Sequence, residues 1–394
     1  DIALKDGYLQ TILTYVQPDI FTVNEIRGMP QSSSITDHDR LITNSLNPSG
    51  GTWARGAYLN STSDPLISQI YFKTSKFTLI SSQLIPCPGT IRDVHLFKLR
   101  YYKDDSGGQP IYLWCAVMHT KAGDGVPEAA DRDLMTSQVM TFLDGLGAPE
   151  NILIMGDFNL YTSSEAAYQN MIAHANADVK FNDPINSPGN WSDNASFASI
   201  HTQATRYDKD GDGACFTGVD CGAECGSDDR FDFILATNSI MNGTKKISYQ
   251  SGTYSVVGQD GLHLDKAIID APVNGSAPAN VITALYEMSD HYPVTLKLDF
   301  QVGYATSEAS SPASQVAGAS ISSLTDTDPE AMDVFKFDID DLGTAEGLAT
   351  KVTNIRIKPG VSNTADWTDH IQGVKIKNGG TGVTIGTPVI TDAY

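Results

Sequence analysis

The sequence predicts a layered α/β domain followed by a small all-β sandwich domain. A helical pattern of apolar residues from Tyr8 to Val16 is followed, across a turn at Pro18 and Asp19, by the strand-like segment IFTVNE. Strand-like runs then recur up to Phe300. After Phe300 the composition changes to Ser, Ala and Gly with almost no charge, and strand signals resume beyond that stretch. The first two observations predict the α/β domain, and the third predicts a second domain.

The elements of the first domain, residues 1–300, follow in a regular order. After IFTVNE, strand signals lie at residues 67–72, 77–85, 94–102, 111–120, 151–156, 231–236 and 294–300. A helical pattern at 131–146 begins near Asp131 and ends at Gly145, where glycine stops a helix. A chain of 394 residues with 41% hydrophobic content is long enough to bury a large core.

The region after residue 300 divides in two. Residues 301–325 are uncharged for most of their length and lack periodicity, which predicts a linker. Residues 326–394 carry short strand signals separated by turn residues, which predict a β-sandwich accessory module. Because a strand signal lies close to Tyr394, we expect this module to be incomplete and part of a longer protein.

Composition and charge favour an exported protein. No apolar run is long enough to cross a bilayer, so we expect a soluble chain without a transmembrane segment. The formal net charge of −21 would repel the phosphates of long duplex DNA, which argues against a chromatin protein and favours an extracellular one. Divalent cations and a local basic strip would still admit a nucleic-acid substrate.

The five cysteines indicate the same environment. Cys215, Cys221 and Cys225 crowd into one loop rich in Gly and Asp, which predicts a local disulfide. Their spacing and the absence of a nearby histidine argue against a structural zinc site. Cys115 lies in a strand-like run and is expected to be a buried thiol, whereas the state of Cys87 stays open.

The segment NILIMGDFN, residues 151–159, places polar groups at the end of a buried strand. Gly156 permits a sharp exit from the strand, and Asp157 and Asn159 project to the same side in extended geometry. Gly, Asp and Asn are also ordinary turn residues, so a simple turn is the alternative interpretation.

Five short motifs occur along the chain in a fixed order: VNE at 23–25, MHTK at 118–121, GDFN at 156–159, RFDFIL at 230–235 and SDHYPV at 289–294. In this order the chain resembles the endonuclease/exonuclease/phosphatase superfamily over residues 1–300. That superfamily includes secreted deoxyribonucleases, abasic-site endonucleases, bacterial sphingomyelinases and inositol-phosphate phosphatases. The resemblance implies a four-layer α/β/β/α sandwich of two packed mixed sheets and a metal-dependent phosphodiesterase activity.

Hydrolysis of a phosphodiester needs a cation, an oriented water and stabilisation of the departing oxygen. Glu25 ends IFTVNE, and its hard oxygens suit Mg²⁺ or Mn²⁺, so it is the expected metal ligand; a solvent-facing acid is the alternative. Asp290 of SDHYPV is the second expected metal ligand.

The remaining catalytic residues follow from the motifs and the resemblance. His119 closes a strand and is expected to contact the scissile phosphate, with a structural histidine as the alternative. Asp157 is expected to orient or activate the attacking water, and Asn159 to hold phosphate or a metal-bound water. The resemblance implies that His291 faces the phosphate and that Asp232 orients it.

Three further segments carry weaker signals. Arg92 matches a phosphate-binding position of related nucleases and Tyr71 is expected to line the cleft, although surface roles are the alternative for both. The segment HTQATR, residues 201–206, is similar to secreted bacterial members, but its chemistry assigns it no role. A membrane substrate would predict an exposed aromatic or aliphatic hairpin, which the sequence does not reveal.

The same cysteine-rich loop opens like a calcium-binding loop. Asp208, Asp210, Asp212 and Gly213 place alternate carboxylates before a glycine turn, but Val219 stands where such loops close with Glu. Structural Ca²⁺ at these aspartates is therefore one prediction, and an acidic surface turn pinned by a disulfide is the other.

The resemblance also implies an opening strand that ends in an asparagine near the metal, and this chain starts beyond it, at Asp1. Truncation is the simplest explanation, and a strand donated by another chain, or a homo-oligomer, is the alternative. We therefore expect a secreted bacterial Mg²⁺-dependent endonuclease that acts on extracellular nucleic acid. A sphingomyelinase-like or other phosphoesterase, and a structural protein built on an inactive nuclease-like domain, remain as alternatives.

Overall fold

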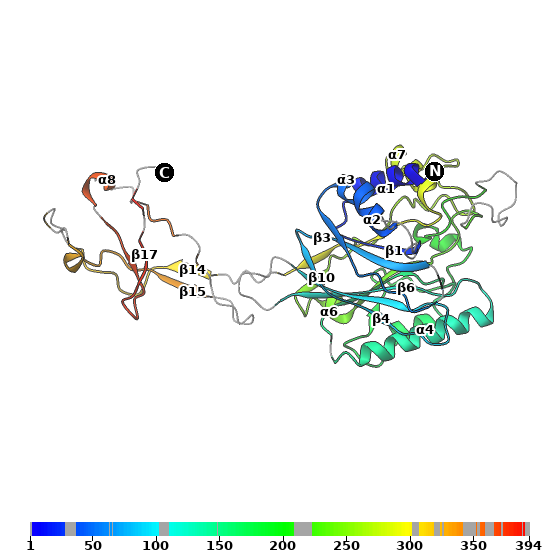
Figure 1. Cartoon of the computed structure of the whole chain (residues 1–394), viewed down its shortest axis with the longest axis horizontal. Coiled ribbons are helices and arrows are strands. Elements are labelled where there is room, and N and C mark those ends of the chain that lie inside the picture. The colour runs from blue at the N-terminus through cyan, green and yellow to red at the C-terminus, as the bar shows by residue number, and fades with distance from the viewer. Residues whose placement is uncertain are drawn as a thin grey trace. The chain divides into compact units, whose positions relative to one another are not determined.

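A computed structural model of the chain describes two compact units (Figure 1). The first comprises residues 2–27, 37–62, 64, 66–101, 110–147, 149–208 and 223–301. The second comprises residues 307–318, 324, 327–341, 352, 355–358, 366–371, 373–387 and 389–390.

The centre of the first unit is a six-stranded mixed sheet with the order β4-β5-β6-β7-β9-β8. Its strands are β4 (Phe77–Ile85), β5 (Val94–Tyr101), β6 (Tyr112–His119), β7 (Ile152–Asp157), β8 (Phe181–Asn182) and β9 (Asp232–Thr237). Only β6 and β7 are parallel, and α4 (Val126–Asp144) makes the crossover between them. The C-terminal ends of β6 and β7 therefore lie next to each other at the same end of the sheet.

A second β layer packs on this sheet (Figure 1). It contains the antiparallel sheet β1-β3-β2, made of β1 (Ile20–Arg27), β2 (Trp53–Arg55) and β3 (Leu66–Lys73). Two short antiparallel pairs accompany it, β10 (Ile247–Tyr249) with β13 (Leu298–Phe300) and β11 (Ser255–Val256) with β12 (Val294–Thr295). The apolar core between the layers draws on alternate residues of β6, including Leu113, Cys115 and Val117.

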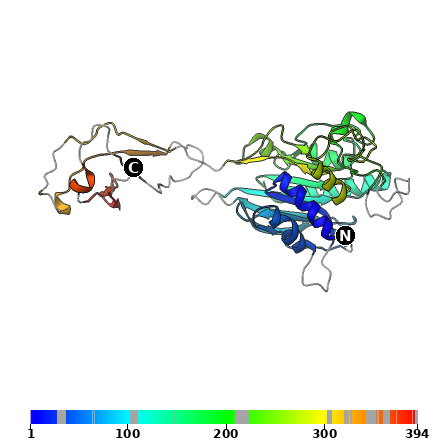
Figure 2. The ribbon, with the colours of Figure 1, turned by 90° about the horizontal axis from the view of Figure 1, so that it is seen from above.

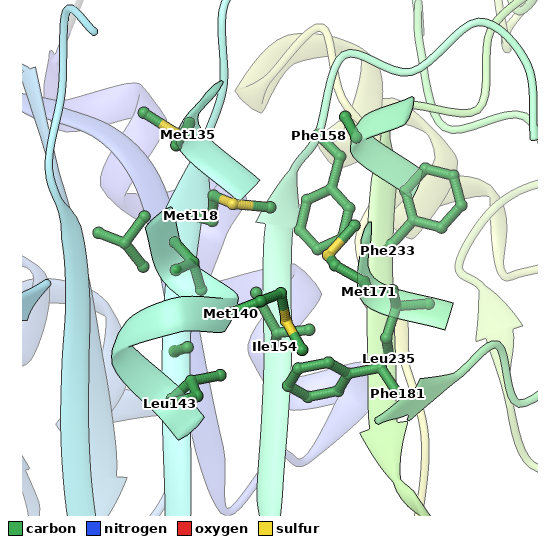
Figure 3. Packing of buried hydrophobic residues seen from close by; sticks show 14 of the residues in the cluster. Met118, Met135, Met140, Leu143, Ile154, Phe158, Met171, Phe181, Phe233 and Leu235 are labelled. Atoms are coloured by element: carbon green, nitrogen blue, oxygen red, sulfur yellow. The ribbon is translucent and has the colours of Figure 1, made fainter. Parts of the chain in front are cut away.

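Helices cover both outer faces. The residues of β6 and β7 that point to the opposite face of the large sheet, such as Met118 and Ile154, pack against α4 and α5 (Ala166–Ile172), as Figure 3 shows. On the opposite side α1 (Ile2–Val16) and α7 (Ala279–Met288) lie side by side (Figure 2). Shorter helices are α2 (Asp37–Leu41), η1 (Ile42–Leu46), α3 (Asn47–Ser49), η3 (Ala195–Ile200) and α6 (Asn238–Asn242). The predicted four-layer α/β/β/α sandwich is thus confirmed.

Several element boundaries differ from the prediction. The helix predicted from Asp131 begins at Val126, because Pro127 suits the first turn of a helix and Gly125 precedes it in an extended conformation. The helix predicted from Tyr8 begins at Ile2, and the strand predicted at 294–300 divides into β12 and β13.

The second unit contains two small antiparallel sheets in its described part. Strand β14 (Ser307–Ser310) pairs with β15 (Asp338–Asp341), and β16 (Ile376–Lys377) pairs with β17 (Thr384–Gly386); η4 (Asp328–Glu330) and α8 (Trp367–His370) are short helices. Strand β14 falls within residues 301–325, so that stretch is not wholly the irregular linker that its composition predicts. No described side chain of this unit is buried, and the β-sandwich stays a prediction.

Cys115 is a buried thiol, as predicted, and Cys87 is a second buried free thiol. The predicted disulfide stays a prediction, because Cys215 and Cys221 lie outside the described residues. Among the helices of the described ranges, none has the length and apolar character needed to span a membrane.

Candidate active site

Three neighbouring strands of the large sheet each place one polar residue in a single row. His119 ends β6 and is in register with Asp157 at the end of β7, and Asp157 is in register with Asp232 at the start of β9. The alternation of side chains puts all three on the face that meets the second β layer. The sequence motifs therefore meet because the strand register aligns them.

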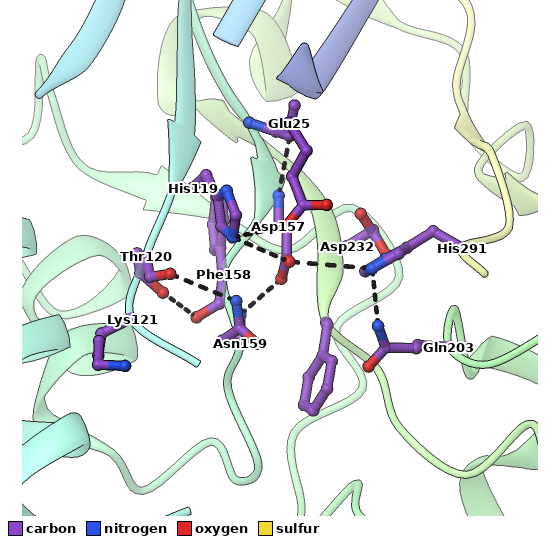
Figure 4. A network of polar contacts seen from close by, with 12 residues as sticks. Glu25, His119, Thr120, Lys121, Asp157, Phe158, Asn159, Gln203, Asp232 and His291 are labelled. Carbon is purple, nitrogen blue, oxygen red and sulfur yellow. Dashed lines mark hydrogen bonds and ion pairs between the residues drawn. The ribbon is translucent and has the colours of Figure 1, made fainter. Parts of the chain in front are cut away.

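Two histidines approach one carboxylate oxygen of Asp157 (Figure 4). Oδ2 of Asp157 lies 3.5 Å from Nε2 of His119 and 4.0 Å from Nε2 of His291. From the second layer, Oε1 of Glu25 lies 3.7 Å from the same nitrogen of His119. The pairing of β1 with β3 is irregular between Val23 and Ile26, and Glu25 has a φ of 57°. Two imidazoles and two carboxylates thus surround one small volume.

Asp232 holds His291 as the resemblance implies. Its Oδ2 lies 2.7 Å from Nδ1 of His291, which leaves Nε2 to face the site. Oδ2 of Asp290 lies 4.0 Å from Nε2 of His291, and it accepts a hydrogen bond of 2.6 Å from the backbone N–H of Ala223.

Asn159 has its backbone and its side chain in different roles. Its backbone N–H donates to Oδ1 of Asp157 at 3.0 Å, which is the local contact that makes an Asp-Phe-Asn turn. Its amide Nδ2 lies 3.4 Å from the carbonyl of Thr120, and its φ is 46°. The turn interpretation is therefore confirmed, and it is compatible with a site role for Asp157, because the turn orients this side chain.

Asn24 is a residue that motif reading missed. Its amide Nδ2 donates to Oγ of Ser68 at 2.7 Å and to the carbonyl of Met118 at 3.1 Å, and its Oδ1 accepts from the N–H of Asp157 at 3.2 Å. One side chain thereby ties β1 to β3, β6 and β7 at the site. Its position beside Glu25 in VNE was the available signal.

The segment HTQATR, to which the sequence assigned no role, supports the other half of the site. Oγ1 of Thr202 accepts hydrogen bonds of 2.9 Å from the backbone N–H groups of both Phe231 and Asp232. Gln203 places its amide Nε2 2.7 Å from Nε2 of His291. No pattern in the sequence brings 201–206 next to 291, because the contact is formed by the fold.

Burial and neighbouring charges set different protonation states for the two histidines. Burial, together with the positive charges of Arg92 and His291, lowers the pKa of His119 to about 3, so this imidazole is neutral near pH 7. Burial opposes the charged form of His291 as well, but the carboxylates of Asp232, Asp157 and Asp290 outweigh it and raise the pKa well above its ordinary value. The site therefore pairs a neutral imidazole with a charged one.

The carboxylates respond in the opposite direction. Burial raises the pKa of Asp157 to about 7, although His291 lowers it in part. The pKa of Glu25 is also raised, mainly by loss of surrounding water, with His291 opposing and Asp290 adding to the shift. A carboxylate whose pKa is close to neutrality suits proton transfer to or from water.

Two predicted substrate-binding residues have different outcomes. Tyr71 does not line a cleft: its side chain is fully buried on the far side of β3, where it stacks on Phe21. The prediction was wrong because period-two alternation turns this residue toward α1 instead of the site. Arg92 does lie beside His119 in a small surface pocket, and its Nε contacts Oδ2 of Asp64 at 2.7 Å.

Among the described residues, no group of three or more His, Cys, Asp and Glu side chains is arranged to hold a metal ion. The predicted calcium ligands Asp210 and Asp212 lie outside the described residues, and Asp208 is the last residue before that gap. Structural calcium therefore stays a prediction.

Comparison with known proteins returns structures and no sequence families. No protein-family model matches the chain, and no curated protein matches its sequence. The human Nocturnin catalytic domain with bound sulfate is 13% identical, with a TM-score of 0.45, over 75% of this chain and 86% of that one. D. rerio TDP2 complexed with a single-stranded DNA product is 15% identical, with a TM-score of 0.45, over 75% and 91%.

An endonuclease/exonuclease/phosphatase from Bacteroides vulgatus is 13% identical, with a TM-score of 0.43, over 76% of this chain and 90% of that one. The Bacteroides vulgatus protein carries the name of the superfamily that the motifs resemble. Because one fold serves many functions, the activity has to be inferred from the side chains of the site.

Proposed function

We propose that this protein is a metal-dependent phosphodiesterase that cleaves nucleic acid. The observation that carries the proposal is the convergence of a neutral His119, a charged His291 and Asp157 on one point. A phosphate placed there would accept a hydrogen bond from the Nε2–H of His119. The positive charge of His291 would stabilise the negative charge of the phosphate. Asp157 would accept a proton from the attacking water, and Asp232 would keep His291 in its orientation.

We propose Mg²⁺ or Mn²⁺ as the cation, held by Glu25 and Asp290. The donor chemistry fits, because both residues offer carboxylate oxygens and the side chain of Glu25 is 56% exposed. Asp290 and Asp232 add to the raised pKa of Glu25, and a divalent cation would offset this repulsion between carboxylates. When bound, the cation would neutralise phosphate charge.

We assign this activity to residues 1–300, with residues 326–394 as an accessory module. The net charge of −21 and the cysteine-rich loop support a secreted protein, and they favour short or single-stranded extracellular nucleic acid over chromatin.

Plasmid cleavage tests the proposal. Wild-type protein with Mg²⁺ should nick supercoiled plasmid, EDTA should abolish nicking, and His291→Ala should lower the rate about 100-fold or more. His174→Ala is the matched control, because His174 pairs with Asp144 on the surface, away from the site. Nicking that persists in EDTA, or that is equal in the two variants, would refute the proposal.

A phospholipid is the second candidate substrate, and one observation favours it. Leu262, Ile269 and Val273 are 59%, 51% and 93% exposed within a single loop. This loop joins the segment that supports the site, because the N–H of Ile268 donates to the carbonyl of Thr205 at 2.9 Å. An apolar loop of this kind suits contact with a lipid surface.

Sphingomyelin vesicles separate the two substrates. If lipid is the substrate, Val273→Ser should lower the rate on vesicles but leave the rate on a soluble phosphodiester unchanged. Activity on plasmid combined with none on vesicles would eliminate the lipid substrate.

A further inference from the structure

The segment 201–206 is a buried support that exposes a single side chain. His201, Thr202, Ala204, Thr205 and Arg206 are all buried, and only Gln203 between them is partly exposed.

The backbone of Gln203 is fixed on two sides, because it bridges to Asp229 and to His291. Its N–H donates to the carbonyl of Asp229 at 3.1 Å, and its carbonyl accepts from the N–H of Asp228 at 2.9 Å. A fixed backbone with one projecting amide is a preorganised arrangement for contact with a ligand.

The amide of Gln203 reaches the nitrogen that faces the site. Its Nε2 lies 2.7 Å from Nε2 of His291, which is the same nitrogen that approaches Asp157 (Figure 4). An amide can present its carbonyl oxygen to the N–H of a charged imidazole, because both ring nitrogens of that imidazole are donors. With its oxygen toward Nε2 of His291, the amide of Gln203 keeps both of its N–H groups available to a group bound beside His291.

The carboxylates around His291 cannot donate a hydrogen bond to phosphate. The side chains of Asp157, Asp232 and Asp290 are acceptors when ionised and repel a phosphate. Arg92, which the sequence favoured as the phosphate-binding residue, already contacts Asp64 at 2.7 Å. An uncharged amide next to His291 would supply a hydrogen bond to phosphate without disturbing the pair of His291 with Asp232.

We propose that Gln203 is a substrate-binding residue that donates a hydrogen bond from its amide to one non-bridging oxygen of the phosphate held by His119 and His291. This inference rests on the proposed phosphodiesterase function and adds to it a specific contact. It also explains why Gln203 is the one residue of 201–206 that is not buried.

Leucine and asparagine at this position test the contact, because Gln203→Leu keeps the size and removes the hydrogen bond, whereas Gln203→Asn keeps the amide on a shorter side chain. Loss of one hydrogen bond to a charged group should lower kcat/KM for a dinucleotide phosphodiester about tenfold to a hundredfold in Gln203→Leu. Gln203→Asn should recover part of that loss.

Gln259→Leu is the matched control. Gln259 donates to the carbonyl of His201 at 3.1 Å and to Oγ of Ser227 at 2.6 Å, so it supports the same segment without reaching the site. A purely structural role for Gln203 would make both leucine variants lose stability alike and would leave kcat/KM per folded molecule unchanged.

The stereochemistry of a phosphorothioate substrate provides a measurement that a purely structural role of Gln203 would not change. The two diastereomers of a dinucleotide phosphorothioate each replace one non-bridging oxygen with sulfur, which accepts hydrogen bonds weakly. For one diastereomer the ratio of wild-type to Gln203→Leu kcat/KM should fall close to one, and for the other it should match the ratio for the oxygen substrate. Equal ratios for both diastereomers would overturn the inference.

Phosphate binding separates this inference from the proposed function. Titration calorimetry with inorganic phosphate and Mg²⁺ should show that Gln203→Leu binds phosphate about tenfold or more weakly than wild type. If wild-type protein hydrolyses no diester but this weakening is found, the proposed activity fails and the contact stands. Equal binding by both proteins, or no binding by wild type, would overturn the contact.

Discussion

Gly156 is the position where a single methyl group would damage both the fold and the site. Its φ is 130°, and a Cβ built there would lie 2.1 Å from the carbonyl oxygen of Met118 and 2.7 Å from Oδ1 of Asn24. The carbonyl cannot move alone, because Met118 and Gly156 are register partners in the parallel pair β6 and β7. Gly156→Ala should therefore displace Asp157 as well as destabilise the sheet.

The size of the loss follows from two effects. A residue with a side chain in this backbone conformation costs roughly 1–3 kcal/mol, and overpacking against fixed backbone costs roughly 1–3 kcal/mol more. The free energy of unfolding should then fall by roughly 2–6 kcal/mol. Gly252→Ala is the matched control, because Gly252 has a φ of 79° and no atom within 4 Å of the added Cβ. The control should lose only the conformational part, roughly 1–2 kcal/mol.

Urea unfolding followed by tryptophan fluorescence measures both losses, and the kcat of the folded variants measures the effect on the site. Gly156→Ala should be the less stable variant and should lose activity, whereas Gly252→Ala should keep it. If the two variants lose equal stability, the proposed overpacking is wrong. If Gly156→Ala keeps full activity, the coupling between this glycine and Asp157 is wrong.

Three further predictions concern named charges. Asp232→Asn removes the carboxylate that holds His291 at 2.7 Å, and kcat on a phosphodiester should fall about 100-fold or more. Asp183→Ala leaves the buried Arg230 without the two oxygens that it contacts at 2.8 and 2.9 Å, and the free energy of unfolding in urea should fall by about 3–5 kcal/mol. Asp228 has a pKa raised to about 7 by burial and by neighbouring carboxylates, so the folded protein binds this proton more tightly than the unfolded chain does. Its contribution to stability is therefore largest near pH 4 and is lost as the pH rises to about 7, and thermal unfolding of Asp228→Asn across this range should lack that decline.

Each of these three variants has its own control or contrary outcome. Circular dichroism should show Asp232→Asn folded, and a kcat within threefold of wild type would contradict its role. Asp144→Ala removes an exposed partner of His174 and should cost less than about 1 kcal/mol, so an equal loss in Asp183→Ala would contradict the buried-pair explanation. For Asp228, a stability difference between variant and wild type that is constant from pH 4 to pH 7 would show that its pKa is not raised.

The sequence was sufficient for the layers and for most residues of the candidate site. Apolar runs with period two mark the strands because each buried strand must present alternate residues to a core. The candidate residues Glu25, His119 and Asp157 were found because polar side chains that close such runs stand at the ends of strands, where a site can form. The role of His291 came from the resemblance that SDHYPV carries. The error at Tyr71 has the same basis, since a residue in a strand buried on both faces gives no sign of which face it joins.

By itself the sequence determined the longer strands of the first unit and the chemical groups at their ends, because both depend on neighbours a few residues apart. Only the tertiary structure decided that Asn24 ties four strands together, that Gln203 meets His291 from 88 residues away, and that Asp64 engages Arg92. Those contacts depend on strand register and on the packing of two sheets, which bring distant segments within hydrogen-bond distance. The protonation of the two histidines is likewise decided by the fold, because burial and nearby carboxylates exist only in the folded protein.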